Sequence, residues 1–110
     1  MIINFDKLDS TIIQNFYGGT KEVISKMFID DNNKIMLATL PSKASIGLHK
    51  HETSSEILYI LKGEGKILEN DRETKILKSG MCHYCPKGES HSLINDSNED
   101  LIFFAVVPNQ

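Results

Sequence analysis

Short apolar runs separated by turn-forming residues make up most of this chain. Across residues 21–40 two such runs flank an Asp-Asp-Asn-Asn cluster at residues 30–33, whose side chains favour a tight turn. This pattern predicts a β-hairpin, although the apolar positions of residues 23–28 would also fit one face of a helix. Further turn signals fall at residues 41–42, 62–63, 79–80 and 86–88. Their close spacing predicts an all-β sandwich or barrel.

Two of the expected strands are apolar on both faces. Residues 57–61 read Ile-Leu-Tyr-Ile-Leu, and residues 101–107 read Leu-Ile-Phe-Phe-Ala-Val-Val. A strand with one face in water should alternate between apolar and polar residues, so something must cover the outer face of these two. The N-terminal segment or a second subunit could do so. We predict a homodimer, because a chain of 110 residues is short for burying every such face.

Composition and charge narrow the classes of function. The 110 residues suit a single domain spanning residues 1–110. No apolar run reaches the roughly 20 residues of a membrane span, and no secretion signal is visible at the N-terminus, so we expect a cytoplasmic protein with reduced cysteines. The net charge is −3 and the sole arginine is Arg72. We therefore expect a small-molecule ligand and no nucleic-acid or membrane partner.

Candidate metal chemistry begins at His49 and His51. Being two residues apart, their rings point to the same face if the segment is a strand. Glu56 stands at the head of the apolar strand that follows, where an inward carboxylate without a partner would be costly. A cation is the natural partner for this group. Imidazole nitrogens combined with a carboxylate oxygen suit a divalent transition metal.

Two segments, residues 49–63 and 80–95, have a fixed spacing of their special residues. They read His49-x-His51-x4-Glu56-x6-Gly63 and Gly80-x5-Pro86-x-Gly88-x2-His91-x3-Asn95. In this spacing the chain resembles the cupin superfamily, which has both motifs. The glycine that the family places six residues before the first histidine is replaced here by Lys43, and the nearest glycine is Gly47.

The resemblance implies the fold, the metal and its ligands. It implies a single-domain cupin β-barrel, also called a double-stranded β-helix or jelly roll. It implies one divalent transition metal ion, which could be Zn, Mn, Fe or Ni. The ligands it implies are His49, His51, Glu56 and His91.

A rival site and several neighbouring residues also need weighing. Cys82 and Cys85 form a C-x2-C pair with His83 between them, which could ligate zinc, but such a pair has little weight without a second one. Packing is the simpler role for the cysteines, and His83 fits a surface or hydrogen-bonded core position better than a ligand. Tyr59 and Tyr84 could donate to a substrate; Tyr59 lies on the strand face opposite Glu56 and fits an interface.

Two classes of function remain open. The first is a metal-dependent enzyme acting on a small organic molecule, with isomerase, dioxygenase, decarboxylase or lyase chemistry. The second is a non-catalytic module that binds or senses a metal or small ligand. A catalytic site should have an acid or base within reach of the bound ligand, besides the metal ligands themselves.

Overall fold

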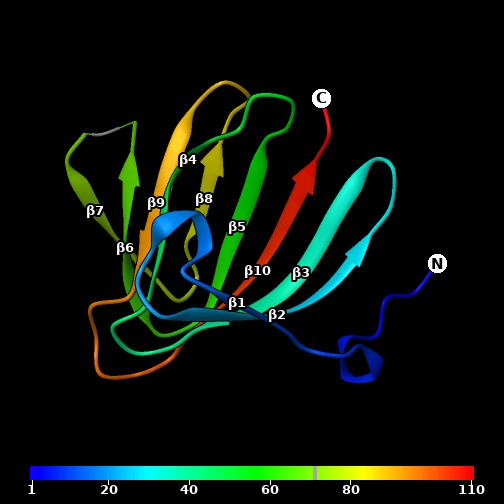
Figure 1. Ribbon diagram of the computed structural model, residues 1–110, viewed down its shortest axis with the longest axis horizontal. Coiled ribbons are helices and arrows are strands. Elements are labelled where there is room, and N and C mark those ends of the chain that lie inside the picture. The colour runs from blue at the N-terminus through cyan, green and yellow to red at the C-terminus, as the bar shows by residue number, and fades with distance from the viewer. Residues whose placement is uncertain (71) are drawn as a thin grey trace.

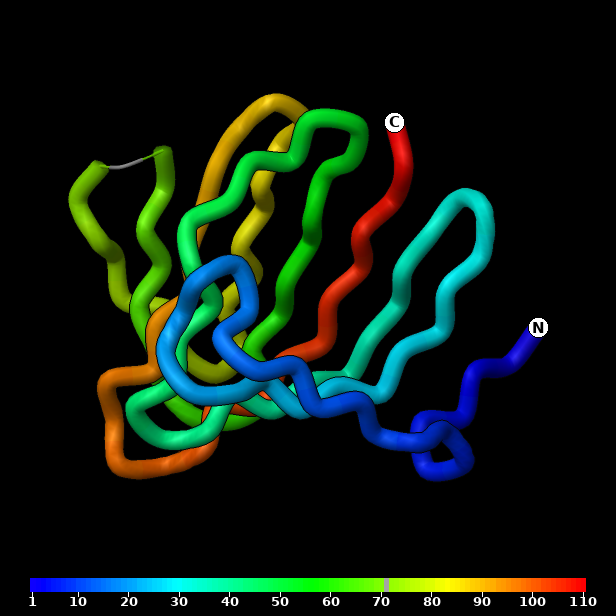
Figure 2. Tube along the Cα trace, in the orientation of Figure 1, coloured from blue at the N-terminus to red at the C-terminus, as the bar shows by residue number. Residues whose placement is uncertain are grey.

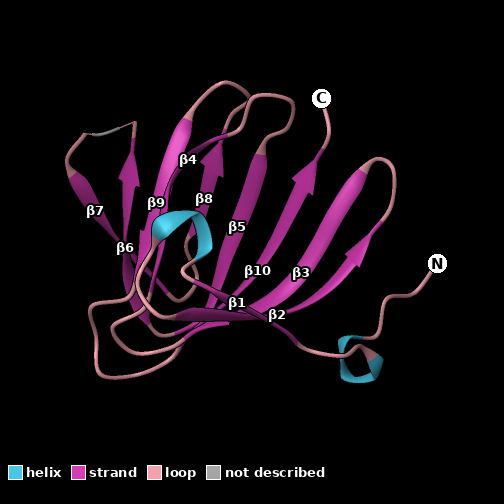
Figure 3. Cartoon of the chain, viewed as in Figure 1, coloured by secondary structure: helices cyan, strands magenta, loops and turns pink. Residues whose placement is uncertain are grey.

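The computed structural model describes residues 1–70 and 72–110, whose regular secondary structure is almost entirely β-strand (Figure 3). The elements in chain order are η1 (Phe5–Lys7), β1 (Thr11–Gln14), η2 (Phe16–Gly18), β2 (Glu22–Ile29), β3 (Asn33–Leu40), β4 (Ser45–Lys50), β5 (Glu56–Lys62), β6 (Glu64–Glu69), β7 (Thr74–Lys78), β8 (Cys82–Cys85), β9 (Ser90–Ile94) and β10 (Leu101–Pro108). Both helices are single 3-10 turns, and no described helix has the length and apolar character needed to cross a membrane.

The strands form two antiparallel sheets that face each other (Figure 1). One has six strands in the order β1-β2-β3-β10-β5-β8, and the other has four in the order β4-β9-β6-β7. Neighbours in the sheets are often far apart in sequence, as β10 is from β3 and β5. The predicted all-β jelly-roll architecture is confirmed.

The hairpin predicted from residues 21–40 is present as β2 and β3. The carboxylate of Asp30 accepts hydrogen bonds from the backbone amides of Asn32 at 2.9 Å and Asn33 at 2.8 Å. These bonds fix the turn in the way that short polar side chains commonly do. The two strands then pair from Ile24 with Thr39 to Ile29 with Lys34. The helical alternative for residues 23–28 is therefore wrong.

The hydrophobic core lies between the two sheets. Alternate residues of the central strands point inward, and the side chains of Leu40, Ile60 and Leu101 are fully buried. Phe103, on β10, is the largest of the buried side chains. Each such side chain contributes roughly 1.5–3 kcal/mol through burial. The core therefore holds the sheets face to face and fixes the strands that bear the candidate site.

The outer face of the six-stranded sheet is apolar across five strands. Cross-strand pairing puts one residue of each strand in a single row, made of Phe28, Ile35, Val106, Ile57 and Tyr84. The N-terminal segment runs along one side of the molecule (Figure 2) and packs Phe5 against Phe104, with ring centroids 6.2 Å apart. On β5, however, Ile57 stays 44% exposed and Tyr59 43% exposed. The N-terminal segment thus covers only part of this face.

The turn before β4 explains how the chain accommodates Lys43 in place of a glycine. Lys43 has a φ of 68°, in the left-handed region that glycine adopts more readily than residues with a side chain. Its ammonium group donates to the carbonyl of Asp96 at 2.6 Å, which partly offsets the backbone cost. Gly47 has a different role, because any side chain there would collide with the backbone carbonyl of Tyr17.

Candidate metal centre

Three strands and a loop bring together the four residues that the sequence indicated. His49, near the end of β4, is paired with His91 on β9. His51 follows β4 directly, and its backbone amide donates to the carbonyl of Glu89 at 3.0 Å, which holds the loop against β9. Glu56 is the first residue of β5. His51, Glu56 and His91 are buried and His49 is partly buried.

The Nε2 atom of His91 lies at the centre of the group. It is 3.1 Å from Nε2 of His49, 3.0 Å from Nε2 of His51 and 3.0 Å from Oε1 of Glu56. Nε2 of His51 is also 3.2 Å from the same Glu56 oxygen. One ligand atom from each of the four residues lies within 4.8 Å of all the others. Four potential donor atoms therefore converge on one point.

The other ring nitrogens are occupied by hydrogen-bond partners. Nδ1 of His49 is 2.8 Å from the carbonyl oxygen of Gly47, and Nδ1 of His51 is 2.9 Å from the hydroxyl of Ser54. A carbonyl can only accept, so Nδ1 of His49 carries the proton and its neutral ring presents a lone pair at Nε2. This second hydrogen bond is the usual feature that orients a metal-binding histidine.

The donor set fits a cation. Neutral imidazoles held in this way direct their lone pairs toward each other and toward a buried carboxylate, which is unfavourable unless a positive charge lies between them. Two ligand atoms at right angles around an ion with bonds of about 2.1 Å are separated by about 3.0 Å. The four closest separations, 3.0–3.2 Å, are near this value.

Electrostatics keep the carboxylate ionised. Burial favours the neutral form of Glu56, but without a metal, hydrogen bonds from Nε2–H groups of His51 and His91 outweigh it and lower the pKa of Glu56 from 4.5 to about 2. A bound metal would take the place of these Nε2 protons. Burial also lowers the pKa of His49, and the neighbouring His91 acts in the same direction, while the bond to Gly47 opposes them. These effects favour an ionised Glu56 and a neutral His49, which are the forms of both groups that bind a metal.

Tyr17, Ser54 and the Gly47 carbonyl support the site but could not be identified from the sequence. The ring of Tyr17 stacks on that of His49, with centroids 4.0 Å apart and planes inclined by 10°. It reaches this position because η2 and β4 approach closely where Gly47 lacks a side chain. No spacing rule links residue 17 to residue 49, so only the fold reveals the contact.

The C-x2-C segment does not form the rival site. On β8 the side chains of His83 and Cys85 are buried, while those of Cys82 and Tyr84 point outward. Both cysteines are free thiols, and burial raises the pKa of the Cys85 thiol to about 11, with Glu56 adding to the effect. Cys82 lies on the wrong face to join the others. A site made of Cys82, His83 and Cys85 is therefore excluded by the strand geometry.

Two further residues near the site have structural roles. Asn95 is fully buried and donates to the carbonyls of Leu40 and Glu99, both at 2.8 Å, so it holds the turn. Lys50, the last residue of β4, lies between His49 and His51, is exposed and faces away from them.

His83 is a buried histidine that contacts the site from outside. Its Nε2 lies 3.0 Å from Nδ1 of His91, and the residue is 6% exposed. If Nε2 of His91 faces the metal, its Nδ1 carries the proton and donates to His83. His83 then holds the ring of His91 in the tautomer and orientation that ligation needs. His83 and Cys85 also form a second group with His91, but His91 is shared with the first.

We expect His83→Ala to weaken metal binding without removing the site. The metal dissociation constant should rise by about 10–100-fold, the usual effect of losing a partner of a metal-binding histidine. At saturating metal the stoichiometry should stay unchanged. His83→Gln is the matched control, because its side-chain oxygen can still accept from His91 and should restore part of the affinity. Isothermal titration calorimetry measures the dissociation constant and the stoichiometry. Complete loss of metal binding in His83→Ala would contradict this role and indicate that His83 is itself a metal ligand.

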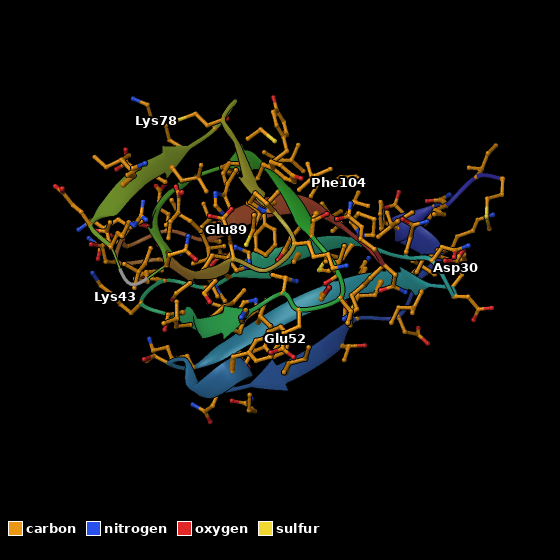
Figure 4. All side chains as sticks on the ribbon, turned by 90° about the horizontal axis from the view of Figure 1, so that it is seen from above. Asp30, Lys43, Glu52, Lys78, Glu89 and Phe104 are labelled. Carbon is orange, nitrogen blue, oxygen red and sulfur yellow. The ribbon has the colours of Figure 1, made fainter. Side chains whose placement is uncertain are left out.

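The site forms one part of the wall of a cavity of about 390 Å³ between the sheets. The four residues lie among its lining, together with apolar residues from both sheets. At the far end lies the tip of the β2–β3 hairpin, whose Asp30 is at the edge of the molecule (Figure 4). A volume of this size is within the range of small-molecule pockets. A ligand in the cavity would thus have direct access to a metal held by the four residues.

The chain belongs to the cupin family. The family model described as "Cupin domain" matches residues 36–107, which contain all four converging residues. This agrees with the fold and with the two spacing motifs.

The relatives refine this assignment. The chain is 36% identical to the "Oxalate-binding protein" of Thermotoga maritima, over 97% of this chain and 93% of the relative. A crystal structure of a "predicted oxalate decarboxylase" from Thermotoga maritima superimposes with a TM-score of 0.92 at 34% identity, covering 100% of both chains. The polyketide cyclase RemF of Streptomyces resistomycificus has the same fold, with a TM-score of 0.82 at 21% identity, covering 98% of this chain and 78% of its own.

Proposed function

We propose that this protein binds one divalent transition metal ion through His49, His51, Glu56 and His91, and binds a small carboxylate on that ion. The observation that carries the proposal is the convergence of Nε2 atoms and a carboxylate oxygen at separations of 3.0–3.2 Å. The ion, which could be zinc, manganese, iron or nickel, would act as a Lewis acid toward the carboxylate oxygens. The name of the oxalate-binding relative supports this class of ligand.

A decarboxylase is the second candidate, favoured by the similarity to the "predicted oxalate decarboxylase" of Thermotoga maritima. Conversion of oxalate to formate and carbon dioxide requires a proton at the carbon that loses the carboxylate. Beyond the four proposed ligands, the described residues lining the cavity include one carboxylate, that of Asp30. Asp30 is engaged with the amides of its turn, and Lys34 and Tyr17 are the other ionisable groups. This favours binding over acid–base catalysis.

Titration of oxalate into the metal-loaded protein tests the proposal. We expect about one oxalate per chain with the metal present and none after complete chelation, because the metal supplies the charge that holds the anion. Equal binding to both forms would contradict the proposal, as would no binding to either. Release of carbon dioxide during the same incubation would favour the decarboxylase instead.

We also propose that the protein is a homodimer formed through the outer face of the six-stranded sheet. That face has the apolar row of Phe28, Ile35, Val106, Ile57 and Tyr84, and exposed apolar patches of this kind are typical of protein interfaces. A cytoplasmic location and the absence of nucleic-acid and membrane partners remain predictions.

The double variant Ile57→Lys/Tyr59→Lys tests the dimer. Light scattering should give twice the chain mass for the wild type and the mass of one chain for the variant, because two charges would be buried in the interface. Ile76→Lys is the matched control: Ile76 is 57% exposed on β7 in the other sheet, and its variant should stay dimeric. A wild-type mass equal to one chain would contradict the proposal.

A further inference from the structure

The cavity is larger and more apolar than a simple dicarboxylate requires. Its volume of about 390 Å³ would hold roughly a dozen water molecules at about 30 Å³ each. Oxalate consists of two joined carboxylates and has no apolar part to contact such a wall. The apolar residues of the wall include Val23, Met27, Met36, Leu58, Leu93 and Phe103. A ligand that used the whole cavity would therefore carry an apolar body.

The cavity offers little to neutralise a second carboxylate away from the metal. Among the described residues of its lining, Lys34 is the one lysine or arginine. Lys34 lies near the beginning of β3 with its side chain on the inward face, close to the hairpin turn that contains Asp30. A guanidinium clamp, the usual partner of a bound carboxylate, is missing from the described part of this lining. The acidic group of a ligand would thus bind at the metal and leave its body in the apolar part.

Ser25 is an unusual polar residue in that apolar part. It is 2% exposed, lines the cavity, and has a hydroxyl without a hydrogen-bond partner among the described residues. On the same face of β2 its neighbours are Val23 and Met27, and across the strand pair it faces Ala38. Buried hydroxyls are nearly always hydrogen-bonded, so one that is not calls for a partner from outside the chain. A polar group of a ligand is such a partner.

Met27 and Met36 suggest which kind of body the ligand has. These residues form a directly opposed pair on β2 and β3, and both line the cavity. Methionine side chains adapt in shape and make favourable contacts between sulfur and aromatic rings. Phe103 lies on the neighbouring strand β10 and also faces the cavity. An aromatic ring would make use of all three.

We propose that the cavity binds an aromatic carboxylic acid, with its acid group at the metal, its ring against Met27 and Met36, and a polar group at its far end hydrogen-bonded to Ser25. This rests on the proposed function, because the acid group needs the metal. The inference goes beyond the proposed function in the ligand that it names. Among aromatic carboxylic acids we propose a 2-oxo acid, which the cavity would bind in addition to oxalate. Such an acid offers adjacent carboxylate and oxo oxygens, which resemble the pair that oxalate presents to a metal.

A series of four acids tests the proposal by calorimetry on the metal-loaded protein: oxalate, pyruvate, phenylpyruvate and 4-hydroxyphenylpyruvate. Pyruvate has the same acid group as the last two but no ring. We expect phenylpyruvate to bind at least about 10-fold more tightly than pyruvate, because its ring is removed from water. We expect 4-hydroxyphenylpyruvate to bind roughly 3–10-fold more tightly than phenylpyruvate, because its hydroxyl would form one further hydrogen bond.

Ser25→Ala should abolish the extra affinity that the ligand hydroxyl gives 4-hydroxyphenylpyruvate over phenylpyruvate. The affinity for phenylpyruvate itself should stay nearly unchanged. The thermal stability of the ligand-free variant should stay the same or rise, since an unpartnered buried hydroxyl is lost. Ser92→Ala is the matched control. Its hydroxyl is also buried but donates to the carbonyl of Ile46 at 2.6 Å, and it is not part of the cavity lining. That variant should lose stability and keep the gain from the hydroxyl.

The outcomes separate this inference from the proposed function. If oxalate binds in a metal-dependent way but phenylpyruvate binds no better than pyruvate, the inference is wrong and the metal–carboxylate function stands. If no acid in the series binds the metal-loaded protein, the proposed function fails and the inference fails with it. If Ser25→Ala keeps the full gain from the hydroxyl, the role given to Ser25 is wrong.

Discussion

Changing either His51 or His91 to alanine should remove most of the bound metal. His91 is the most decisive position, because its Nε2 is within 3.1 Å of a donor atom from each of the other three residues. His51 contacts both His91 and Glu56. Loss of either ring leaves three donors and opens the site to water, so affinity should fall by more than about 100-fold, beyond the effect of losing a supporting hydrogen bond. Elemental analysis after gel filtration measures the bound metal.

The double variant Cys82→Ser/Cys85→Ser is the matched control for this experiment. Cys82 points out of the barrel, and Cys85 lies beside the site without being one of its four converging residues. Its metal content should therefore stay near that of the wild type. Loss of the metal from the cysteine variant, combined with its retention in His51→Ala, would show that the assignment of the ligands is wrong.

Removing the metal should lower the melting temperature by about 10 °C or more. A ligand that binds only the folded state at about 1,000 times its dissociation constant adds roughly 4 kcal/mol to the free energy of unfolding, and each kcal/mol shifts the melting of a small domain by several degrees. The physical reason lies in Glu56, a carboxylate that is 8% exposed and needs positive charge beside it. Differential scanning calorimetry with and without a chelator measures the shift.

The change in melting temperature on metal removal should become smaller as the pH is lowered. The pKa of His49 is lowered in the folded protein, mainly by burial, so protonation favours the unfolded chain once the pH drops below the ordinary value of 6.5. Metal binding requires the same neutral imidazole, and the shift should shrink as the pH goes from about 6.5 to 5. The low pKa of Glu56 acts later: its contribution is complete above 4.5 and is lost as the pH falls toward about 2. An identical melting curve after complete metal removal at neutral pH would contradict a metal held at Glu56.

The strand pattern in the sequence was sufficient to predict an all-β sandwich or barrel, because burial in β-strands follows a period of two, while the jelly-roll topology came from the resemblance to cupins. Along β5 the residues from Glu56 to Leu61 alternate between buried and exposed without exception, although nearly all are apolar. Apolar residues at both sets of positions indicate a second apolar face from the sequence alone. What periodicity could not show is how much of that face the N-terminal segment covers, because this depends on contacts between residues far apart in sequence, such as Phe5 and Phe104 (Figure 4).

The residues with metal-ligand chemistry could be selected from the sequence because their spacing is fixed, but their supporting contacts could not. The hydrogen bond between His83 and His91 joins β8 to β9, and the stacking of Tyr17 on His49 joins residues 32 positions apart. Such contacts depend on sheet order and on close backbone approach at Gly47, neither of which leaves a local pattern. The position of Ser25 in the cavity wall could not be predicted either, since serine is mostly an exposed residue.

A crystal structure of the protein grown with a transition metal, with data collected on both sides of the metal's absorption edge, tests the central claim most directly. We expect one anomalous peak per chain, bonded to Nε2 of His49, His51 and His91 at roughly 2.0–2.2 Å and to a carboxylate oxygen of Glu56. One or two remaining positions should hold water or a carboxylate. A peak bonded to Cys85 and His83 instead, or no peak among the four residues at saturating metal, would contradict the claim.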